Sequence, residues 1–297
     1  MAANKFFTIS LLKEKSTYAT LLLSFTLILC SGIATIAQTK KNKHQIIAIN
    51  AAEISTGTNS KAIINVTIIN GLGGEPLTEG CVLIKDGKIQ EVGKMSDVSI
   101  PAAAEITDAS GMYLLPGFID SHFHLDRTKG LPAKFLQHGV TSIRDPGAWI
   151  ESYDEERKSG KKIPRLFLTG PHFDMPPPAY PYDAYIVRDN YEAIKQVNAL
   201  ADQGATALKI YFRVPPGMIQ AICSTAHQRG IPVTAHLEIT EAMIAIEAGL
   251  DGVEHITSFG LSLLPKREGE KYRQGMLSDN NFRQPGRYNM WRDININ

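Results

Sequence analysis

The 297-residue chain contains little cysteine, and this scarcity excludes two kinds of site. Its three cysteines, Cys30, Cys81 and Cys223, lie far apart in the sequence. They fit neither a disulfide framework nor a C-x-x-C metal site. Cys30 also lies in a segment that we expect to be removed. The sequence therefore predicts neither a disulfide-stabilised scaffold nor a cysteine-ligated metal.

The chain also lacks an excess of either charge. Its 31 lysines and arginines nearly balance 30 aspartates and glutamates, which gives a formal net charge of +1. This balance argues against nucleic acid or an anionic membrane surface as the main partner. The 43% of hydrophobic and 21% of charged residues are ordinary for a soluble globular protein. The length suffices for one large domain, or for a large and a small one.

The N-terminal apolar run is too short for an ordinary membrane span. It covers roughly residues 19–30, whereas a spanning helix needs about 20 apolar residues. Three lysines precede it, and Thr35 and Ala37 are placed for cleavage before Gln38. This order is typical of a secretory signal peptide. We therefore predict that residues 1–37 are a signal peptide and that the mature protein is exported, periplasmic or secreted. A membrane anchor is the alternative.

The stretch from Gly111 to Asp126 reads GMYLLPGFIDSHFHLD and carries the first candidate metal ligands. After a Pro-Gly pair, a short apolar run ends in His122 and His124. Side chains at positions i and i+2 of a β-strand project from the same face, so we expect both imidazoles on one side, with Asp120 extending that face. Two histidines placed in this way are typical ligands of one metal ion. A loop with two solvated histidines is the alternative.

The rest of the chain indicates two kinds of architecture. Residues 62–109 are strand-like, and Asp86-Gly87 between two apolar runs predicts a hairpin. Beyond Pro116 strands alternate with helices, which predicts β/α units around a parallel sheet. We expect strands at 118–125, 141–145, 165–169, 207–211, 232–236 and 252–256, and helices at 191–203, 218–228 and 240–248. Three glycines follow these helices, and a Pro- and Tyr-rich loop at 176–185 is expected over the active face of the sheet.

The run PGFIDSHFH at residues 116–124 resembles the first metal-binding strand of the amidohydrolase superfamily. It resembles in particular the secreted branch similar to imidazolonepropionase and metal-dependent Xaa-Pro dipeptidases. This resemblance covers approximately residues 62–259. It implies an α/β fold, a (β/α)8 TIM barrel that is incomplete here, with about six βα units. Residues 38–115 would be part of a small β-sandwich subdomain, and residues 116–297 the partial metal-dependent barrel.

The resemblance also implies a metal site at the carboxyl ends of the strands, where such barrels place their active sites. Five side chains fall at or near the ends of expected strands one, four, five and six: His122, His124, Lys209, His236 and His255. They would hold two divalent ions, Zn²⁺ by their type, bridged by Lys209 as N6-carboxylysine. A lysine that binds substrate or pairs with a carboxylate is the alternative. His227, within an expected helix, is interpreted as structural.

The implied function is hydrolysis of a carbon–nitrogen bond in an amide, a peptide or a cyclic amide through a metal-bridging hydroxide. The substrate would be a small molecule or a dipeptide. Tyr211, Arg213 and His172 are candidate substrate-binding residues, and Arg213 has the geometry to bind a carboxylate with two hydrogen bonds. Glu238 also lies near the expected mouth. For each of these an ordinary rim position is the alternative, and a homo-oligomer is left open.

The sequence lacks one residue that the resemblance requires, an aspartate at the end of an eighth strand. That residue would bind metal and shuttle a proton. After Phe259 no further apolar strand is expected, and Asp279 and Asp293 lie in charged, turn-rich stretches. We therefore leave the catalytic residue unassigned. A fragment of a longer enzyme, a chain completed by a second chain, and an inactive pseudoenzyme that binds metal or ligand all remain open.

Overall fold

The computed structural model describes residues 46–54, 57, 59–126 and 128–295. The predicted signal peptide lies outside these residues. Within the described ranges, no helix is both long enough and apolar enough to cross a membrane. The first described helix is a short 3-10 helix, η1 (Ala51–Glu53), which begins next to the buried Asn50. The Asn50 side chain donates to the carbonyl of Pro164 and accepts from the N–H of Leu166.

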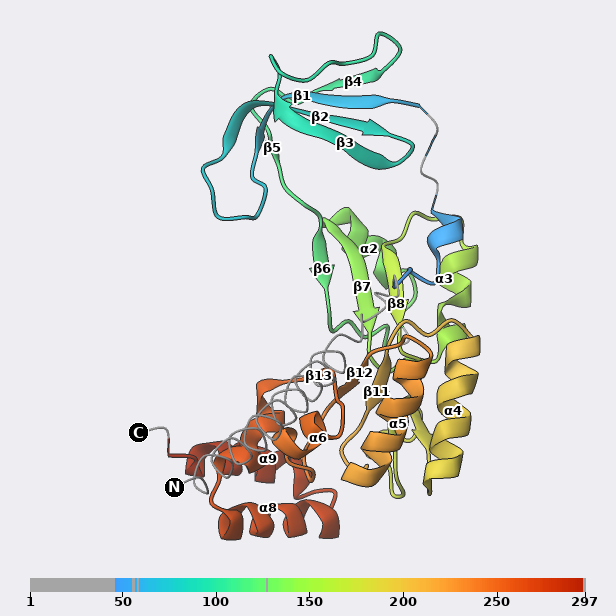
Figure 1. Cartoon of the computed structure of the whole chain (residues 1–297), viewed down its shortest axis with the longest axis vertical. Helices are drawn as coiled ribbons and strands as arrows, with labels where there is room; N and C mark the ends of the chain where they lie inside the picture. The colour runs from blue at the N-terminus through green and yellow to red at the C-terminus, as the bar shows by residue number, and fades with distance from the viewer. Residues whose placement is uncertain (1–45, 55–56, 58, 127, 296–297) are drawn as a thin grey trace, which may run out of the picture. The chain divides into compact units, whose positions relative to one another are not determined.

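Residues 61–114 form a five-stranded sheet (Figure 1). Its strands are β1 (Lys61–Ile68), β2 (Leu77–Lys85), β3 (Lys88–Lys94), β4 (Glu105–Asp108) and β5 (Tyr113–Leu114). The predicted hairpin is confirmed, because β2 and β3 pair antiparallel on either side of Asp86 and Gly87. Both turn residues have positive φ, 51° and 69°, as a two-residue hairpin turn requires. Val66, Ile68, Val82 and Ala109 form the small core of this sheet.

Residues 118–253 contain two parallel sheets, one with the order β6-β7-β8 and the other with the order β10-β9-β11-β12-β13. The strands are β6 (Phe118–Asp120), β7 (Val140–Asp145), β8 (Arg165–Leu168), β9 (His172–Asp174), β10 (Ala184–Ile186), β11 (Leu208–Ile210), β12 (Val233–Ala235) and β13 (Gly252–Val253). A hydrogen bond of 2.8 Å from the Thr206 N–H to the Leu168 carbonyl joins the two sheets. All six expected strands are present, and the mixed α/β fold with parallel strands is confirmed.

The first parallel strand is shorter than predicted. β6 ends at Asp120, so His122 and His124 follow the strand instead of lying on it. The Asp120 carboxylate accepts the N–H of His122 at 3.0 Å, and a side chain that bonds to the backbone two residues on favours a turn. The argument from strand alternation was therefore wrong for this pair. A turn, and not a β-strand face, orients the two imidazoles.

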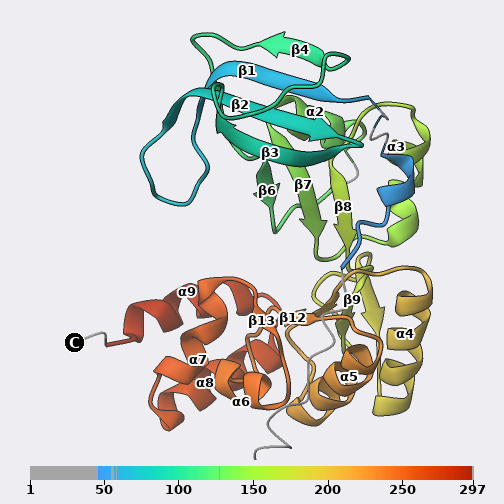
Figure 2. The ribbon, with the colours of Figure 1, turned by 45° about the horizontal axis from the view of Figure 1, so that its top comes forward.

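The expected helices are confirmed as α4 (Asn190–Asp202), α5 (Pro216–Gln228) and α6 (Ala242–Glu247). Gly204, Gly230 and Gly249 follow them with φ of 90°, 72° and 105°, values that glycine adopts without strain. α4 and α5 lie side by side (Figures 1 and 2). Their apolar faces join the strand residues in one core, which includes Val197, Ile219, Leu208 and Val233. This core gives the strand ends a rigid support.

Further helices complete the described chain. Two of them, α2 (Leu131–Gln137) and α3 (Asp154–Lys158), follow β6 and β7, with η2 (Ile150–Tyr153) directly before α3. After β13 come η3 (Ile256–Phe259), α7 (Gly260–Leu263), α8 (Lys266–Ser278) and α9 (Arg283–Asp293). None of these helices was predicted. Between Phe259 and Asn295 every described element is helical, which agrees with the expectation that no further apolar strand follows.

Candidate active site

A cavity of about 1100 Å³ lies at the carboxyl ends of the parallel strands. Seven of the predicted site residues line it: His122, His124, His172, Lys209, Tyr211, His236 and His255. Tyr180 and Tyr182, from the loop that we expected over this face, also line it. Arg213 does not. The strand order thus collects residues that are more than 130 positions apart in the chain, from His122 to His255, around one space.

The four candidate histidine ligands form a chain of neighbouring rings. The His122 ring centre lies 5.1 Å from that of His124 and 4.5 Å from that of His255. The His255 and His236 rings are 4.8 Å apart. His255 has φ 62° and ψ 136°, a backbone conformation that non-glycine residues rarely adopt and that often marks a functional position. The two sequence-distant pairs of histidines are therefore one cluster.

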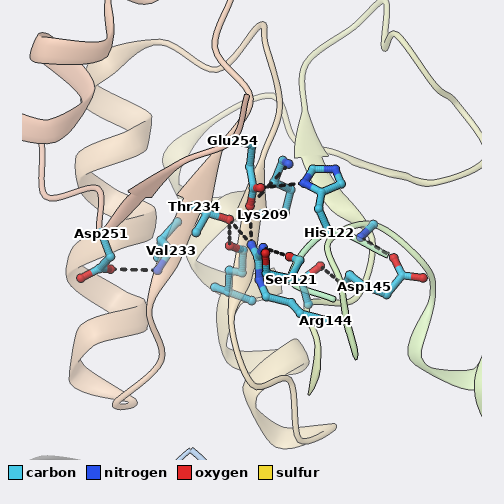
Figure 3. A network of polar contacts seen from close by, with 12 residues as sticks. Ser121, His122, Arg144, Asp145, Lys209, Val233, Thr234, Asp251 and Glu254 are labelled. Carbon is cyan, nitrogen blue, oxygen red and sulfur yellow. Dashed lines mark hydrogen bonds and ion pairs between the residues drawn. The ribbon is translucent and has the colours of Figure 1, made fainter. Parts of the chain in front are cut away.

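Glu254 is the centre of the polar network behind this cluster (Figure 3). One of its carboxylate oxygens bonds to His122 Nδ1 at 2.7 Å, and the other accepts from Arg144 and lies 3.8 Å from Lys209 Nζ. Burial alone raises the pKa of Glu254, but the hydrogen bonds from His122 and Arg144 outweigh it and hold the pKa far below its usual range. Glu254 is therefore an anion among three basic groups.

Lys209 lies in β11 with only 2% of its surface exposed. Burial is the main reason that its pKa falls to about 7, and nearby Arg144 lowers it further, while Glu254 partly offsets both effects. The side chain lines the cavity. The sequence predicted this position, but neither Glu254 nor Arg144 was singled out. The one available signal was that Glu254 directly precedes His255 at the end of an expected strand.

Asp145, the last residue of β7, holds the segment that carries His124. Its fully buried carboxylate accepts the N–H groups of Leu125, Gly147 and Ala148 at 3.0–3.1 Å. It also accepts the Tyr153 hydroxyl at 2.8 Å, and one oxygen lies 3.6 Å from His124 Nδ1. Although burial raises the pKa of Asp145, these hydrogen bonds lower it below its usual value. Asp145 therefore attaches the loop that follows β6 to the end of β7. Sequence reasoning did not identify this residue.

The three candidate substrate-binding residues have different surroundings. His172 is 4% exposed, its ring lies 4.5 Å from that of Tyr211, and its Nε2 has no hydrogen-bond partner among the described residues. The Tyr211 hydroxyl accepts from Arg283 at 2.7 Å. Arg213 is engaged elsewhere, because its guanidinium donates to the Pro177 carbonyl and to the Asn280 side chain at 2.7 and 2.5 Å. His172 and Tyr211 thus face the cavity, and Arg213 braces the loop beside it.

The donor set fits a divalent metal ion by its chemistry. No three His, Cys, Asp or Glu side chains of the described ranges are already arranged around a common point. However, His122 bonds to Glu254 through Nδ1, and His236 bonds to Glu238 through Nε2 at 2.8 Å, which leaves one ring nitrogen of each for a metal. Metal-binding histidines usually have such a carboxylate on the second nitrogen. The residues present therefore suit the divalent ions that this type of site takes.

The buried Asp174 gives a test of the electrostatics beside the cavity. Burial raises its pKa to about 6, although it accepts the N–H groups of Met175, Ala179 and Arg213. The folded state therefore binds more protons than the unfolded state between about pH 4 and 6, and this contribution to stability is lost as the pH rises through 6. Relative to Asp174→Asn, we expect the unfolding free energy of the wild type to fall by about 2–3 kcal/mol from pH 4 to 7.

Urea unfolding of both proteins at several pH values measures this difference. Asp97→Asn, at an exposed position after β3, is the matched control and should follow the wild type at every pH. Parallel pH profiles for the wild type and Asp174→Asn would contradict the prediction.

The fold and the site together define a class of α/β proteins in which parallel β/α units place histidines and a buried lysine at the strand ends. The comparison with known families agrees with this class. The sequence model described as the amidohydrolase family matches residues 113–267, more than half of the chain. The chain therefore belongs to the amidohydrolase family, as the resemblance predicted. Enzymes of this family generally use divalent metals.

Two curated relatives illustrate the range of the family. The chain is 41% identical over 85 residues to an adenine deaminase of Listeria monocytogenes, a match that covers 27% of this chain and 14% of the relative. It is 26% identical over 223 residues to an N-acetylglucosamine-6-phosphate deacetylase of Lysinibacillus sphaericus, with coverage of 66% and 56%. Both names describe hydrolysis of a carbon–nitrogen bond. The chain spans little more than half the length of the second relative and much less of the first.

Among solved structures, a candidate prolidase from Bifidobacterium longum is similar with a TM-score of 0.56 and 26% identity. The match covers 67% of this chain and 54% of that chain. The fold and the family are thus shared with an enzyme of this kind over about two thirds of the present chain.

Proposed function

We propose that the chain is a metal-dependent hydrolase of carbon–nitrogen bonds in amides, peptides or cyclic amides. The observation that carries the proposal is the cluster of His122, His124, His236 and His255 beside the buried Lys209. Relatives that deaminate, deacetylate or cleave peptides support the same bond type. The substrate is a small molecule or a dipeptide, and neither nucleic acid nor an anionic membrane is the partner.

The domain organisation is part of this proposal. Residues 38–115 form part of a small β-sandwich, and residues 116–297 form about six units of a (β/α)8 barrel. Residues 1–37 are a signal peptide that directs export to the periplasm or the medium. The oligomeric state is left open, with a homo-oligomer as one arrangement.

The proposed metal ligands are the four histidines and Lys209 in its N6-carboxylated form. When bound, two zinc-type ions would lower the pKa of a water molecule and polarise the scissile carbonyl group. Carboxylation suits Lys209 because it turns a buried cation near Arg144 into an anion with two oxygens. Glu254 is the one carboxylate within 4.0 Å of Lys209 among the described residues, and it already bonds to His122 and Arg144.

Other residues of the chain position this cluster. Glu254 and Glu238 orient the rings of His122 and His236 by hydrogen bonds to one nitrogen of each ring, which leaves the other nitrogen to hold a metal ion. Asp145 fixes the loop that carries His124. Tyr180 and Tyr182 line the cavity beside these residues. These contacts make the site rigid, which lowers the cost of ordering it when substrate binds.

The alternative proposal is a protein that binds metal or ligand without turnover. It is favoured by the surroundings of the two C-terminal aspartates. Asp279 accepts the N–H of Asn281, and Asp293 bonds to Tyr272 and Arg292. Neither aspartate lines the cavity. Neither of these two C-terminal aspartates is therefore placed to act as the proton-shuttling aspartate that the family pattern requires.

An assay of the chain prepared with zinc and bicarbonate tests the proposal. We expect release of free amine from at least one proline-containing dipeptide or lactam, complete loss in His122→Ala, and retention in His227→Ala. His227 is the control because it pairs with Asp251 at 2.7 Å and does not line the cavity. A chain that contains metal but hydrolyses none of these substrates would select the alternative.

A further inference from the structure

Two arginines of α9 point toward the candidate active site from one side. Arg283 and Arg287 are four residues apart, so they lie on the same face of the helix, one turn from each other. Both reach Glu238, the residue that bonds to His236. Arg287 lines the cavity together with its helix neighbours Gln284 and Tyr288. No sequence pattern singled out either arginine.

Arg283 has a complete set of partners. Its side chain is 7% exposed, its Nε donates to Glu238 Oε2 at 2.6 Å, and its Nη2 donates to the Tyr211 hydroxyl at 2.7 Å. The guanidinium also lies over the rings of Tyr211 and Phe212, 5.2 and 4.7 Å from their centres. This arginine therefore has a structural role, which is to attach α9 to the strand ends.

Arg287 lacks such a set. Its Nη1 lies 3.4 Å from Glu238 Oε1 and 3.4 Å from His236 Nε2, and its Nη2 donates to the neutral Gln284 side chain at 2.7 Å. Its Nε is buried and has no hydrogen-bond partner in the described part of the chain. Glu238 is already engaged, because Oε1 bonds to His236 at 2.8 Å and Oε2 bonds to Arg283 at 2.6 Å. The guanidinium is thus only weakly paired.

The charges immediately around Glu238 do not balance. Two guanidinium groups share one carboxylate, Glu238, which leaves one positive charge at a side chain that is 13% exposed. A weakly paired charge in such a position is costly, and an anion would relieve the cost. The free Nε and the adjacent Nη2 form the edge of the guanidinium that binds carboxylates with two parallel hydrogen bonds. Gln284 is a neutral partner that a carboxylate can displace.

We propose that Arg287 binds a carboxylate of the ligand that occupies this cavity. The proposal rests on the proposed function, and it narrows the substrates to carbon–nitrogen compounds that carry an acid group, such as N-acyl amino acids or dipeptides. Arg287 is then the specificity-determining residue. Arg213, the arginine favoured from the sequence, is held by Pro177 and Asn280 away from the cavity lining.

Calorimetric titration of the metal-free full chain tests this role without requiring turnover. The probes are N-acetyl-L-proline and its neutral amide, N-acetyl-L-prolinamide. We expect the wild type to bind the acid at least about tenfold more tightly, since a charge-assisted pair contributes that much discrimination. Arg287→Gln should bind both probes within about twofold of each other. Arg287→Lys should keep part of the preference, because it retains the charge and loses the two-bond geometry.

The matched control is Arg292→Gln on the same helix, at a side chain that is 72% exposed and pairs with Asp293. It should bind the acid like the wild type. Circular dichroism of all variants confirms that α9 is retained. Equal affinity of the wild type for acid and amide would overturn the proposal, and so would an acid preference that survives in Arg287→Gln. Inorganic phosphate that binds as tightly as the acid would reject a substrate carboxylate in favour of a general anion site.

Hydrolysis assays separate this inference from the proposed function. A wild type that hydrolyses neutral and acidic amides equally well keeps the proposed function and refutes the role of Arg287. A wild type that hydrolyses neither, but prefers the acid in calorimetry, keeps the role of Arg287 in a binding protein and refutes the hydrolase.

Discussion

Replacement of Lys209 by alanine is expected to reduce the metal content of the purified chain from about two ions to one or fewer. Lys209 lies beside the histidine cluster, and a carboxylated lysine would supply the only group of the proposed set that reaches both ions. Its loss also leaves a void at a site that is 2% exposed. Metal analysis of chains prepared with zinc and bicarbonate measures the change directly, and no substrate is needed.

His227→Ala is the control for this experiment. It removes an imidazole of the same chain that pairs with Asp251, 42% exposed and outside the cavity lining. Its metal content should equal that of the wild type. Mass spectrometry of the native chain should also detect the added carboxylate in the wild type and not in Lys209→Ala. Equal metal content in the wild type and Lys209→Ala means that the assignment of a bridging lysine is wrong.

The parallel strands could be predicted because their sequence signal is local. A run such as Ala207–Tyr211 is apolar, short and bounded by a glycine-terminated helix, and no distant residue is needed to identify it. Since parallel strands carry their sites at one end, the histidines that follow these runs were expected in one place. The cavity lining confirms that His122, His236 and His255 meet there.

The turn after β6 could not be predicted from hydrophobic periodicity. Phe118, Ile119 and Phe123 suggested a strand that continues through both histidines, but hydrogen bonds to Asp120 and Asp145 bend the chain. Asp145 belongs to the next strand, β7, and lies 20 residues after Leu125, whose N–H it accepts. A side chain that competes for backbone N–H groups in this way can be recognised only when both segments are in place.

The residues around the site were missed for a related reason. In the sequence, Arg144 and Glu254 are ordinary charged residues near strand ends, and only the sheet order brings them within hydrogen-bond distance. The C-terminal helix α9 contributes only Met290 to the four buried residues of a small core, Leu261, Leu264, Met276 and Met290, and its helical period is weak. Arg283 and Arg287 therefore carried no signal before the fold was known.

Neutralisation of the Glu254 carboxylate should lower the stability of the folded chain markedly. Its carboxylate is the common acceptor of His122 and Arg144 and lies 3.8 Å from Lys209 (Figure 3). Its side chain is 9% exposed and that of Lys209 is 3% exposed, so water compensates little for a missing charge. When one partner of a buried ion pair is removed, the remaining charge is left uncompensated, which costs about 3–5 kcal/mol.

We therefore expect Glu254→Gln to lower the unfolding free energy of the metal-free chain by about 3–5 kcal/mol. Glu241→Gln is the matched control, because Glu241 pairs with Arg273 at 3.0 Å but is 35% exposed, and a surface pair contributes only about 0–1 kcal/mol. Denaturant unfolding at neutral pH compares the two variants, and an unchanged slope with denaturant confirms that the folded states remain comparable. The network around Glu254 has no stabilising role if both substitutions change the unfolding free energy equally. A selective loss in Glu254→Gln would show that this carboxylate holds the basic groups at the strand ends together before any metal binds.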